Sequence, residues 1–504
     1  MKRIFFIITV FIISGIACTD LDEEIFDGLT LDQYPENPSQ VASISASAYT
    51  GLKPLIDDEG WWFLAQEITS DEFCGPTRDA DWYDGGKWVN MHQHNWTNDD
   101  EGVNRMWEKL WIAVTTCNIS LDIMRQFQQT PEVIAKIREV ETVRSLYYYL
   151  LLDNFGDIPY LTSKAFAPEK PSKITREAVF DSLVTTVERA LPSLKLIDNK
   201  NLATRYMAFS LLAKLYLNAE VYTSSPQWNK ADAYIDSVLA GPYSFTSDIL
   251  SPFVTSNENS SEIIFSIPYD EDTYKGFRLH MRSLHYHSNL TYNMAVGPWN
   301  GLCVTPNHFD TYENSDIRKD DYFLYGPQFD INGNQITDGV THQALDIDPH
   351  LPAIYMTAEN YTPDEYRNTG ARVEKYEIAI GAKENLSNDF PLFRITDFYL
   401  MKAETQIRLL GDGSGDGWIN QIRARAGVSS WTGAGLDSLL AERGRELWVE
   451  GHRRQDLIRY GKFTNAWWAK GDSQGGTSGD PSVKLFPIPK WATDANPNLL
   501  LDPQ

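Results

Sequence analysis

A charged stretch near the C-terminus, residues 441–463, limits the fold more than any other part of the chain. It reads AERGRELWVEGHRRQDLIRYGKF, and the apolar residues leading into it recur on one helical face while Arg and Glu fill the remainder. Gly451 and Gly461 offer two helix stops. The segment between these glycines is too short to be stable as an isolated helix, so it must pack against another part of the chain.

The charges in this stretch are spaced to pair with one another. Glu442 can meet Arg445, and Glu450 can reach Arg453 at i+3 and Arg454 at i+4. Beside so many apolar residues, these charges predict a partly buried ion-pair network at a helix–helix junction. The alternative is an active-site cluster of carboxylates and arginines, which is less expected because structural ion pairs outnumber catalytic ones.

The N-terminus has the pattern of a secretory signal peptide. Two basic residues precede an apolar run over residues 4–13 that is too short to span a bilayer, and Cys18 follows a small residue, as in a lipoprotein cleavage site. We expect cleavage to remove residues 1–17 and leave Cys18 lipidated; ordinary cleavage with an unmodified Cys18 is the alternative. The acidic residues 18–38 are expected to form a solvated tether.

Helical periodicity predicts a mainly α chain before and after a central segment that lacks this periodicity. Residues 241–391 are rich in Asn, Asp, Gly and Pro, contain short β-like runs, and include the hairpin signal Asn332-Gly333. This segment is expected to be a loop-rich insertion, the kind of region that often carries function. The expected helices cover residues 39–51, 103–126, 133–152, 175–194, 204–221, 228–240, 395–410 and 418–426.

Several motifs resemble those of one protein family. The stretch 441–463 resembles the C-terminal signature of the RagB/SusD family, and NFGDIP (154–159), YLMKAE (399–404) and FPIP (486–489) match further elements of the family pattern. The resemblance extends from Cys18 to the C-terminus in the order of its motifs. It is most specific in the C-terminal third.

The resemblance implies a SusD-like fold in a single domain over residues 39–504. That fold is a tetratricopeptide-like helical scaffold, at about 39–240 and 392–504, which carries the loop-rich insertion with short β-strands at about 241–391. Family members are outer-membrane lipoproteins of Bacteroidetes that face the cell exterior. They bind oligo- or polysaccharides and deliver them to a SusC-like TonB-dependent transporter. The rival hypotheses are a peptide- or glycoprotein-binding member of the family and a surface glycosidase.

The charge and the cysteines restrict the other function classes. The formal net charge of −25 disfavours nucleic acid and anionic lipid surfaces as partners, since both require cationic patches. Besides Cys18, the chain has Cys74, Cys117 and Cys303, an odd number whose wide spacing gives neither a zinc motif nor a disulfide framework. One bridge, between Cys74 and Cys117, would be compatible with this count.

Aromatic residues in polar loops are the best candidates for a binding site. The long segment 74–101 places several of them among Asp, Gly and Asn, where Trp82 has no periodicity that would bury it. Rings in wet loops suit sugars, because pyranose C–H faces pack on rings while hydroxyls seek polar partners. The alternative for each ring is a role in a local core, and Trp96, which stands next to a predicted helix, is ambiguous. The candidate glycan contacts are Arg78, Asp81, Trp82, Tyr83, Trp88, Trp96, Tyr286 and Trp299.

The motifs that could carry catalysis or metal binding are incomplete. The Gly-rich segment 412–417 has calcium-loop spacing, but Arg423 occupies the position that requires a bidentate Glu, so a helix connector is the better interpretation. His92 and His94 have no third ligand at clear spacing. Asp79, Asp81 and Asp84 could pair for glycoside hydrolysis, but any acidic loop has this appearance. We therefore expect no catalytic residues, no cofactor and no metal.

Overall fold

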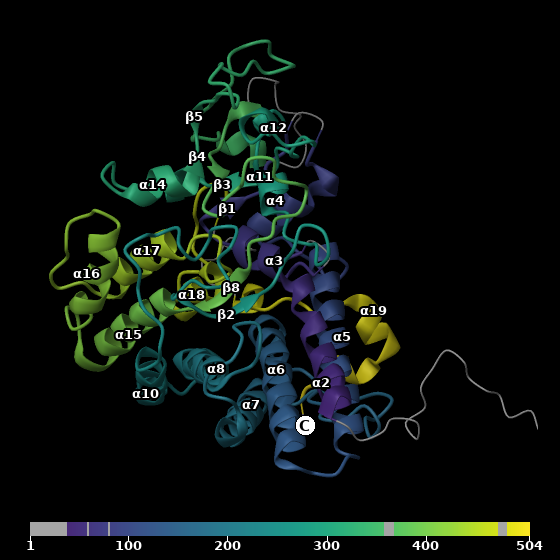
Figure 1. The fold of residues 1–504 in the computed structure, drawn as a ribbon. Coiled ribbons are helices and arrows are strands. Elements are labelled where there is room, and N and C mark those ends of the chain that lie inside the picture. Colours follow the sequence, from purple (N-terminus) through teal and green to yellow (C-terminus); the bar gives the residue numbers. More distant parts are fainter. Residues whose placement is uncertain (1–37, 58–59, 79–80, 357–366, 472–480, 504) are drawn as a thin grey trace, which may run out of the picture.

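The computed structural model describes residues 38–57, 60–78, 81–356, 367–471 and 481–503. Long helices pack side by side in the lower part of Figure 1 and form a scaffold. The scaffold helices are α5 (Glu101–Met124), α6 (Pro131–Phe155), α7 (Arg176–Ala190), α8 (Arg205–Leu217), α10 (Trp228–Leu239), α15 (Ile395–Leu410), α16 (Asp416–Arg425), α17 (Leu436–Glu446) and α18 (Arg453–Arg459). Helix α6 packs between α5 and α7, and α10 packs between α8 and α15, which confirms the predicted mainly α scaffold.

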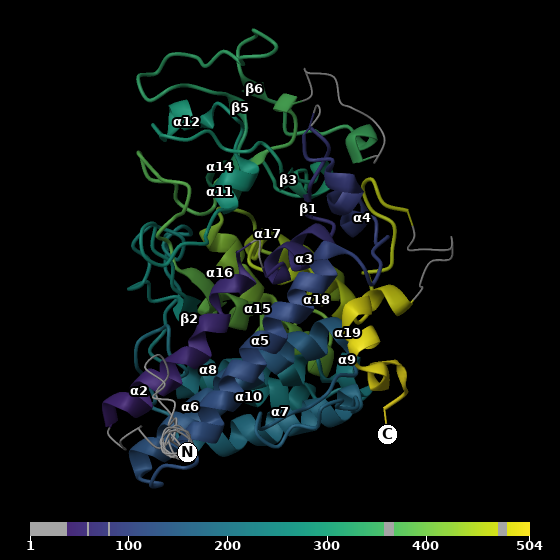
Figure 2. The ribbon, with the colours of Figure 1, turned by 90° about the vertical axis from the view of Figure 1, so that its right-hand side faces the viewer.

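Shorter helices lie before, within and after this scaffold. Figure 2 shows the last of them beside the lower helices, near the C-terminus. They are α2 (Pro38–Ala46), α3 (Trp62–Ile68), α4 (Lys87–His92), α9 (Ala219–Thr223), α11 (Leu279–Ser283), α12 (Ser288–Thr291), α13 (Pro306–Phe309), α14 (Ile317–Tyr322) and α19 (Lys490–Ala495).

Threonine side chains set the start of three scaffold helices. The hydroxyls of Thr130, Thr175 and Thr204 each accept a hydrogen bond from the backbone N–H three residues later, at 3.4, 3.1 and 3.2 Å. Such caps satisfy N–H groups that have no partner within the helix. Helix α6 ends at Gly156, whose φ of +73° favours glycine.

The insertion, in teal and green at the top of Figure 1, has little regular structure. The strands among the described residues form antiparallel pairs, β1 with β3, β2 with β8, β4 with β7 and β5 with β6, and β1 comes from the scaffold side of the chain. The predicted hairpin is confirmed: the Asp330 N–H donates to the Asn334 carbonyl at 2.8 Å, and Gly333 has a φ of +82°. The strands are β1 (Phe73–Cys74), β2 (Ile263–Ile267), β3 (Cys303–Val304), β4 (Phe323–Leu324), β5 (Gly326–Pro327), β6 (Asp346–Ile347), β7 (Arg372–Val373) and β8 (Phe390–Arg394).

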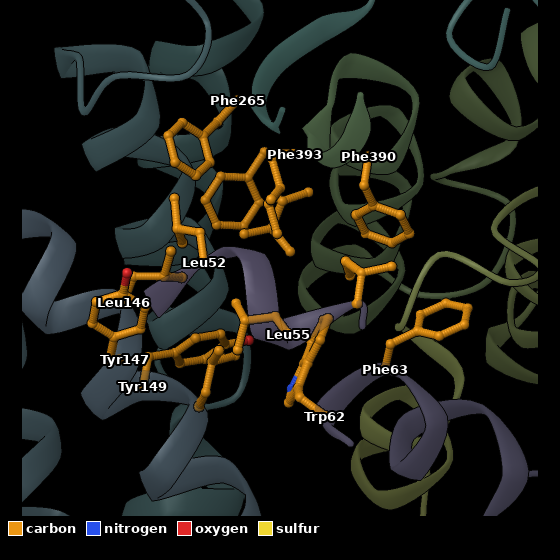
Figure 3. Packing of buried hydrophobic residues seen from close by; sticks show 14 of the residues in the cluster. Leu52, Leu55, Trp62, Phe63, Leu146, Tyr147, Tyr149, Phe265, Phe390 and Phe393 are labelled. Atoms are coloured by element: carbon orange, nitrogen blue, oxygen red, sulfur yellow. The ribbon is translucent and has the colours of Figure 1, made fainter. Parts of the chain in front are cut away.

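One large hydrophobic core joins the scaffold to the base of the insertion. Figure 3 shows Trp62 and Phe63 of α3 in the same cluster as Tyr147 of α6 and Phe393 of β8. Burial of aromatic and aliphatic side chains on this scale is the main source of stability in such a fold. Ile119 of α5 lies outside this core, with 45% of its surface exposed.

The charged stretch at residues 441–463 is buried, as its pattern predicts, but the expected partners of Glu450 are wrong. Helix α17 ends at Glu446, and positive φ angles at Val449 and Gly451 turn the chain before α18 begins. Because the turn interrupts the helix, Glu450 does not lie next to Arg453 and Arg454 as it would at helical i+3 and i+4 spacing. Arg453 instead pairs with Asp71 at 2.7 Å.

Glu450 binds two cations that are distant from it in the sequence. Its carboxylate lies 2.6 Å from the Lys375 Nζ and 2.5 Å from the Arg394 Nε, and Arg394 also contacts Glu446 at 3.1 Å. These four side chains, at most 1% exposed, are called the ion-pair hub. The arginines hold the pKa of Glu446 at about 2 although burial alone would raise it, so the carboxylate stays charged.

The bridge between Cys74 and Cys117 that the cysteine count allowed is not formed. Cys74 lies opposite Cys303 in the β1–β3 pair, with their Sγ atoms 3.7 Å apart, and Cys74, Cys117 and Cys303 are all buried free thiols. Cys18 and the predicted signal peptide lie outside the described residues. No helix among the described residues is long and apolar enough to cross a membrane.

Candidate functional site

The segment expected to be a long polar loop is largely folded. It contains α4, and two glycines, Gly85 and Gly86, with φ angles of +69° and +84°, turn the chain into this helix. Trp88 of α4 is buried and stacks on Trp61 with ring centroids 4.9 Å apart, while its Nε1 donates to the Asp84 carboxylate at 2.7 Å. Trp88 is therefore a core residue, which corrects its prediction as a surface contact.

Trp82 is also buried, with only 7% of its surface exposed. Its Nε1 donates to the Trp299 carbonyl at 2.6 Å, and its ring lies 5.4 Å from that of Trp88. A side chain at Gly301 would collide with this ring, so the insertion covers it closely. The prediction of an exposed ring is wrong, because residues more than 200 positions away in the sequence supply the cover and no local pattern reports them.

Arg78 is held beneath the surface and does not face solvent. The side chain is 1% exposed and donates to the Thr369 carbonyl at 2.7 Å and to the Cys303 Sγ at 3.3 Å. These contacts tie the segment after β1 to the insertion. The structure therefore contradicts Arg78 as a direct partner of sugar hydroxyls and gives it a positioning role.

Four of the predicted residues do meet at the surface, and together they are called the aromatic face: Asp81, Tyr83, Tyr286 and Trp299. Tyr83 is 41% exposed, Asp81 is exposed, and Tyr286 and Trp299 are half-buried. The Tyr286 hydroxyl donates to the Asp81 carboxylate at 2.8 Å, which links the scaffold side of the face to the insertion side. The buried rings of Trp82 and Trp88 lie beneath it.

Arginines surround the rings of the aromatic face. The guanidinium of Arg282 lies 5.7 Å from the Trp299 ring and 5.9 Å from the Trp88 ring, and that of Arg278 lies 5.8 Å from Trp299. Arg367 lies 4.8 Å from the Tyr286 ring. These cation–π contacts hold the rings in place and put hydrogen-bond donors beside the face.

A network around Asp338 supports the same face, and sequence reasoning missed it. The Asp338 carboxylate lies 3.4 Å from the His285 Nε2, 3.7 Å from the His287 Nε2 and 3.3 Å from the Arg367 Nε. Burial would raise the pKa of Asp338, but two backbone N–H groups and the Arg367 charge hold it below its usual value. The only local signal was the His285-Tyr286-His287 triplet, which alone does not identify an acidic partner.

Trp96 belongs to a different place. Its ring packs between His94 and Phe486, at 4.8 Å from each, and lines a hollow of about 520 Å³ together with Arg176 and Phe155. The structure does not bring Trp96 together with the aromatic face. It fits the alternative that the sequence left open for this residue, a ring that joins a loop to the scaffold.

The carboxylates and histidines of this segment form no metal-binding cluster among the described residues. No group of three or more His, Cys, Asp or Glu side chains is placed to hold an ion within the described ranges. His92 and His94 are buried, and burial lowers the pKa of His94 to about 2, so it is neutral. Asp81 and Asp84 accept hydrogen bonds from Tyr286 and from the Trp88 Nε1, and Asp79 lies outside the described residues.

The loop at 412–417 connects two helices, as its Arg-disrupted calcium spacing predicts. The Asp416 carboxylate accepts the backbone N–H groups of Gly433 and Ala434, at 2.7 and 3.0 Å. These bonds use the oxygens that an ion would require.

A tetratricopeptide-like helical scaffold, a loop-rich insertion and an exposed ring-lined face at their junction define a class of binding protein. The model of the SusD family matches residues 261–503, and a model described as "Starch-binding associating with outer membrane" matches residues 37–217. The chain belongs to the SusD/RagB-like family.

Individual relatives are distant in sequence but similar along their whole length. Starch-binding protein SusD of Bacteroides thetaiotaomicron is 23% identical over 95% of this chain and 94% of its own, and SusD-like protein P25 of Formosa agariphila is 24% identical over 79% and 78%. Surface glycan-binding protein A from B. thetaiotaomicron, solved with laminarihexaose, has a TM-score of 0.71 at 22% identity and covers 91% of this chain and 97% of that chain. A SusD superfamily protein from Parabacteroides distasonis has a TM-score of 0.73 at 19% identity, covering 94% and 99%.

Proposed function

We propose that this protein is a cell-surface glycan-binding protein whose aromatic face captures an oligo- or polysaccharide. The observation that carries the proposal is the hydrogen bond between Tyr286 and Asp81, which fixes two solvent-facing groups beside the exposed ring of Tyr83. Rings accept the C–H face of a sugar, and carboxylate and guanidinium groups take its hydroxyls. The related starch-binding protein and the related structure with laminarihexaose support this class of ligand.

The buried rings give the face its rigidity. Trp82 and Trp88 pack on each other in the loop that bears Tyr83, and the Trp82 Nε1 ties this loop to the insertion by donating to the Trp299 carbonyl. A preorganised face loses little conformational entropy when a glycan binds, so more of the contact energy appears as affinity.

Calorimetric titration tests the proposal with the full chain carrying Cys18→Ala. Laminarihexaose and soluble starch are the first probes, followed by a glycan array. Tyr83→Ala removes the most exposed ring of the face and should weaken binding of the best ligand by about thirtyfold, since an aromatic anchor is worth about 2 kcal/mol. The matched control is Phe166→Ala, which removes a ring that is 90% exposed in the segment between α6 and α7. Equal affinity in both variants would contradict the site, and no glycan ligand on the array would contradict the function.

We propose that the protein binds its glycan without cleaving it. Asp81 and Asp84, the carboxylates available near the face, accept hydrogen bonds from Tyr286 and Trp88 that position the loop. A glycosidase needs one carboxyl group free to donate a proton and another free to activate water or attack the sugar. Release of reducing sugar during prolonged incubation with the bound glycan would overturn this part.

The anchor and the delivery partner complete the proposal. Residues 1–17 would be removed, Cys18 lipidated, residues 18–38 would form the tether, and residues 39–504 the binding domain. The family description that mentions outer-membrane association supports this location, and a SusC-like TonB-dependent transporter is the proposed recipient. Cys18→Ala should move the protein from the membrane to the soluble fraction; equal membrane retention would contradict the anchor.

A further inference from the structure

A hollow of about 490 Å³ lies away from the aromatic face, between α6, α7 and the C-terminal end of α5. Four arginines line it: Arg125 just after α5, Arg138 and Arg144 on α6, and Arg189 on α7. In Figure 1 these helix ends lie in the lower part of the scaffold. A volume of this size lies within the range of ligand pockets.

Three of the arginines converge on one carboxylate. Glu141 Oε2 lies 2.6 Å from the Arg138 Nη1 and 3.2 Å from the Arg189 Nη2, and its Oε1 lies 3.4 Å from the Arg125 Nη2. Burial would raise the pKa of Glu141, but these arginines and Arg144 hold it below its usual value. One carboxylate therefore compensates a group of guanidiniums that carries a larger total charge.

Arg144 lies deepest in the hollow. It is 2% exposed and donates its Nη1 to the Asn118 side chain at 2.7 Å and to the Thr162 carbonyl at 3.0 Å. Its Nε has no hydrogen-bond partner among the described residues. A buried guanidinium N–H without an acceptor is costly, and an anion in the hollow would satisfy it.

The rest of the lining offers mainly donors. Tyr160, Ser182, Thr185 and Thr186 also line the hollow; the Ser182 hydroxyl donates to the Ala178 carbonyl at 2.8 Å, and the Tyr160 and Thr186 hydroxyls lie 3.4 Å apart. The acidic residues of the lining are Glu141 and Asp181, so four positive charges stand against two negative ones. Asp122 lies outside the lining and pairs with Arg125 at 3.5 Å. A cationic hollow is unexpected in a chain whose formal net charge is −25.

We propose that this hollow, the arginine pocket, binds an oxyanion, the phosphate or sulfate group of a ligand. Guanidinium groups match such oxygens in pairs, and several arginines from different helices can surround one tetrahedral anion. The group could belong to a lipid headgroup or to a small solute such as a sulfated sugar. Helix α2, the first described element, packs against α5 and α6, the helices that border this pocket (Figure 2).

The test compares sulfate with chloride at equal ionic strength, using the full chain with Cys18→Ala. Sulfate binding is measured by calorimetry and by thermal melts, and we expect sulfate to raise the melting temperature more than chloride. Since sulfate also stabilises proteins nonspecifically, only the difference between variants counts. The double variant Arg125→Gln/Arg189→Gln should weaken sulfate binding by at least about tenfold, because each lost charged hydrogen bond contributes substantially.

Two further variants separate the pocket from general charge effects. Arg105→Gln removes a cation of α5 that pairs with Glu108 at 3.7 Å and does not line the pocket, so sulfate binding should be unchanged. Glu141→Gln removes the competing carboxylate and should strengthen sulfate binding severalfold, which a purely structural ion-pair cluster would not do. If sulfate acts no differently from chloride, or if Arg105→Gln weakens binding as much as the double variant, the proposal is wrong.

Vesicle sedimentation then identifies the source of the oxyanion. Greater binding to phosphatidylglycerol vesicles than to phosphatidylcholine vesicles, lost in the double variant, would assign the pocket to a lipid headgroup. Sulfate binding without any difference between the vesicles would assign it to a soluble oxyanion. Melts in chloride show whether each variant is folded, and the two exchanged arginines are 38% and 52% exposed, so folding should persist.

Discussion

The ion-pair hub and the aromatic face are both built where the helical scaffold meets the insertion, yet they have opposite relations to water. In the hub, Glu450 of the scaffold side binds Lys375 and Arg394, and all three side chains are at most 1% exposed. In the face, Asp81 and Tyr83 meet a tyrosine and a tryptophan of the insertion, and the rings remain open to solvent. The junction is therefore closed to water at the hub and open to it at the face.

The largest effect is expected from breaking the hub. Glu450→Ala removes the carboxylate between two buried cations, and an uncompensated buried charge costs roughly 3–5 kcal/mol. The midpoint of urea unfolding should fall strongly, while Glu108→Ala, which removes a half-exposed ion-pair partner of α5, should change the unfolding free energy by at most about 1 kcal/mol. An unchanged midpoint for Glu450→Ala would show that water enters the hub.

Trp82→Ala tests whether the layer beneath the face is core. The ring is 7% exposed and packs on Trp88, so its removal should destabilise the fold by about 3 kcal/mol or more through the cavity that it leaves. A thermal melt measures this effect. If the variant is as stable as wild type and has lost only glycan affinity, Trp82 is a surface residue of the binding site and not part of the core.

Glu67 is a buried carboxyl beside the hub, and its contribution to folding stability should change with pH in the opposite direction to that of the hub. Burial raises the pKa of Glu67 from 4.5 to about 7, so the folded state holds a proton that the unfolded chain releases, and stability from this group falls as pH rises from about 4.5 to 7. The hub residue Glu446, with its pKa lowered to about 2, loses stability as pH falls from about 4.5 to 2.

Glu67→Gln isolates the first of these two contributions. The amide can still accept the Gly451 N–H, now bonded at 2.6 Å to the Glu67 carboxylate, but it cannot ionise. The difference in unfolding free energy between variant and wild type should shift in favour of the variant by up to about 3 kcal/mol between pH 4.5 and pH 8. Urea unfolding at both pH values measures the gain; a constant difference between the two proteins would contradict the raised pKa.

The smallest effect on stability is expected at the face. Tyr83→Ala removes a ring that is 41% exposed, and its unfolding free energy should stay within about 0.5 kcal/mol of wild type. The same melt that shows a large loss for Trp82→Ala would measure it. A comparable loss in both variants would remove the distinction between an open face and its buried support.

The sequence predicts the scaffold well, because helices of this length carry their own periodicity and caps. Thr130 and Gly156, for example, mark the ends of α6 by local chemistry that is visible in the chain. The family motifs add the order of the segments. The buried state of residues 441–463 also follows from its mixture of charged and apolar residues.

The partners in the site could not be predicted, because they depend on segments far apart in the chain. Glu450 has two arginines at helical spacing, yet a turn at Gly451 directs it to Lys375 and Arg394 instead. Trp82 lacks any burying pattern, but Gly301 leaves the space that its ring fills. Local composition predicted exposed rings in this loop and misassigned which of them reach solvent.

The pairing of β2 with β8 has a consequence for exchanging parts between relatives. Ile267 lies opposite Phe390, so the two ends of the segment between them adjoin, and its length can change at little cost in loop-closure entropy, about 0.6 kcal/mol per doubling. A chimera that exchanges this segment alone would transfer Tyr286 and Trp299 but not Asp81 and Tyr83, which belong to the scaffold side. Transfer of ligand preference from one homologue to another therefore requires two grafts made together, residues 73–101 and 268–389.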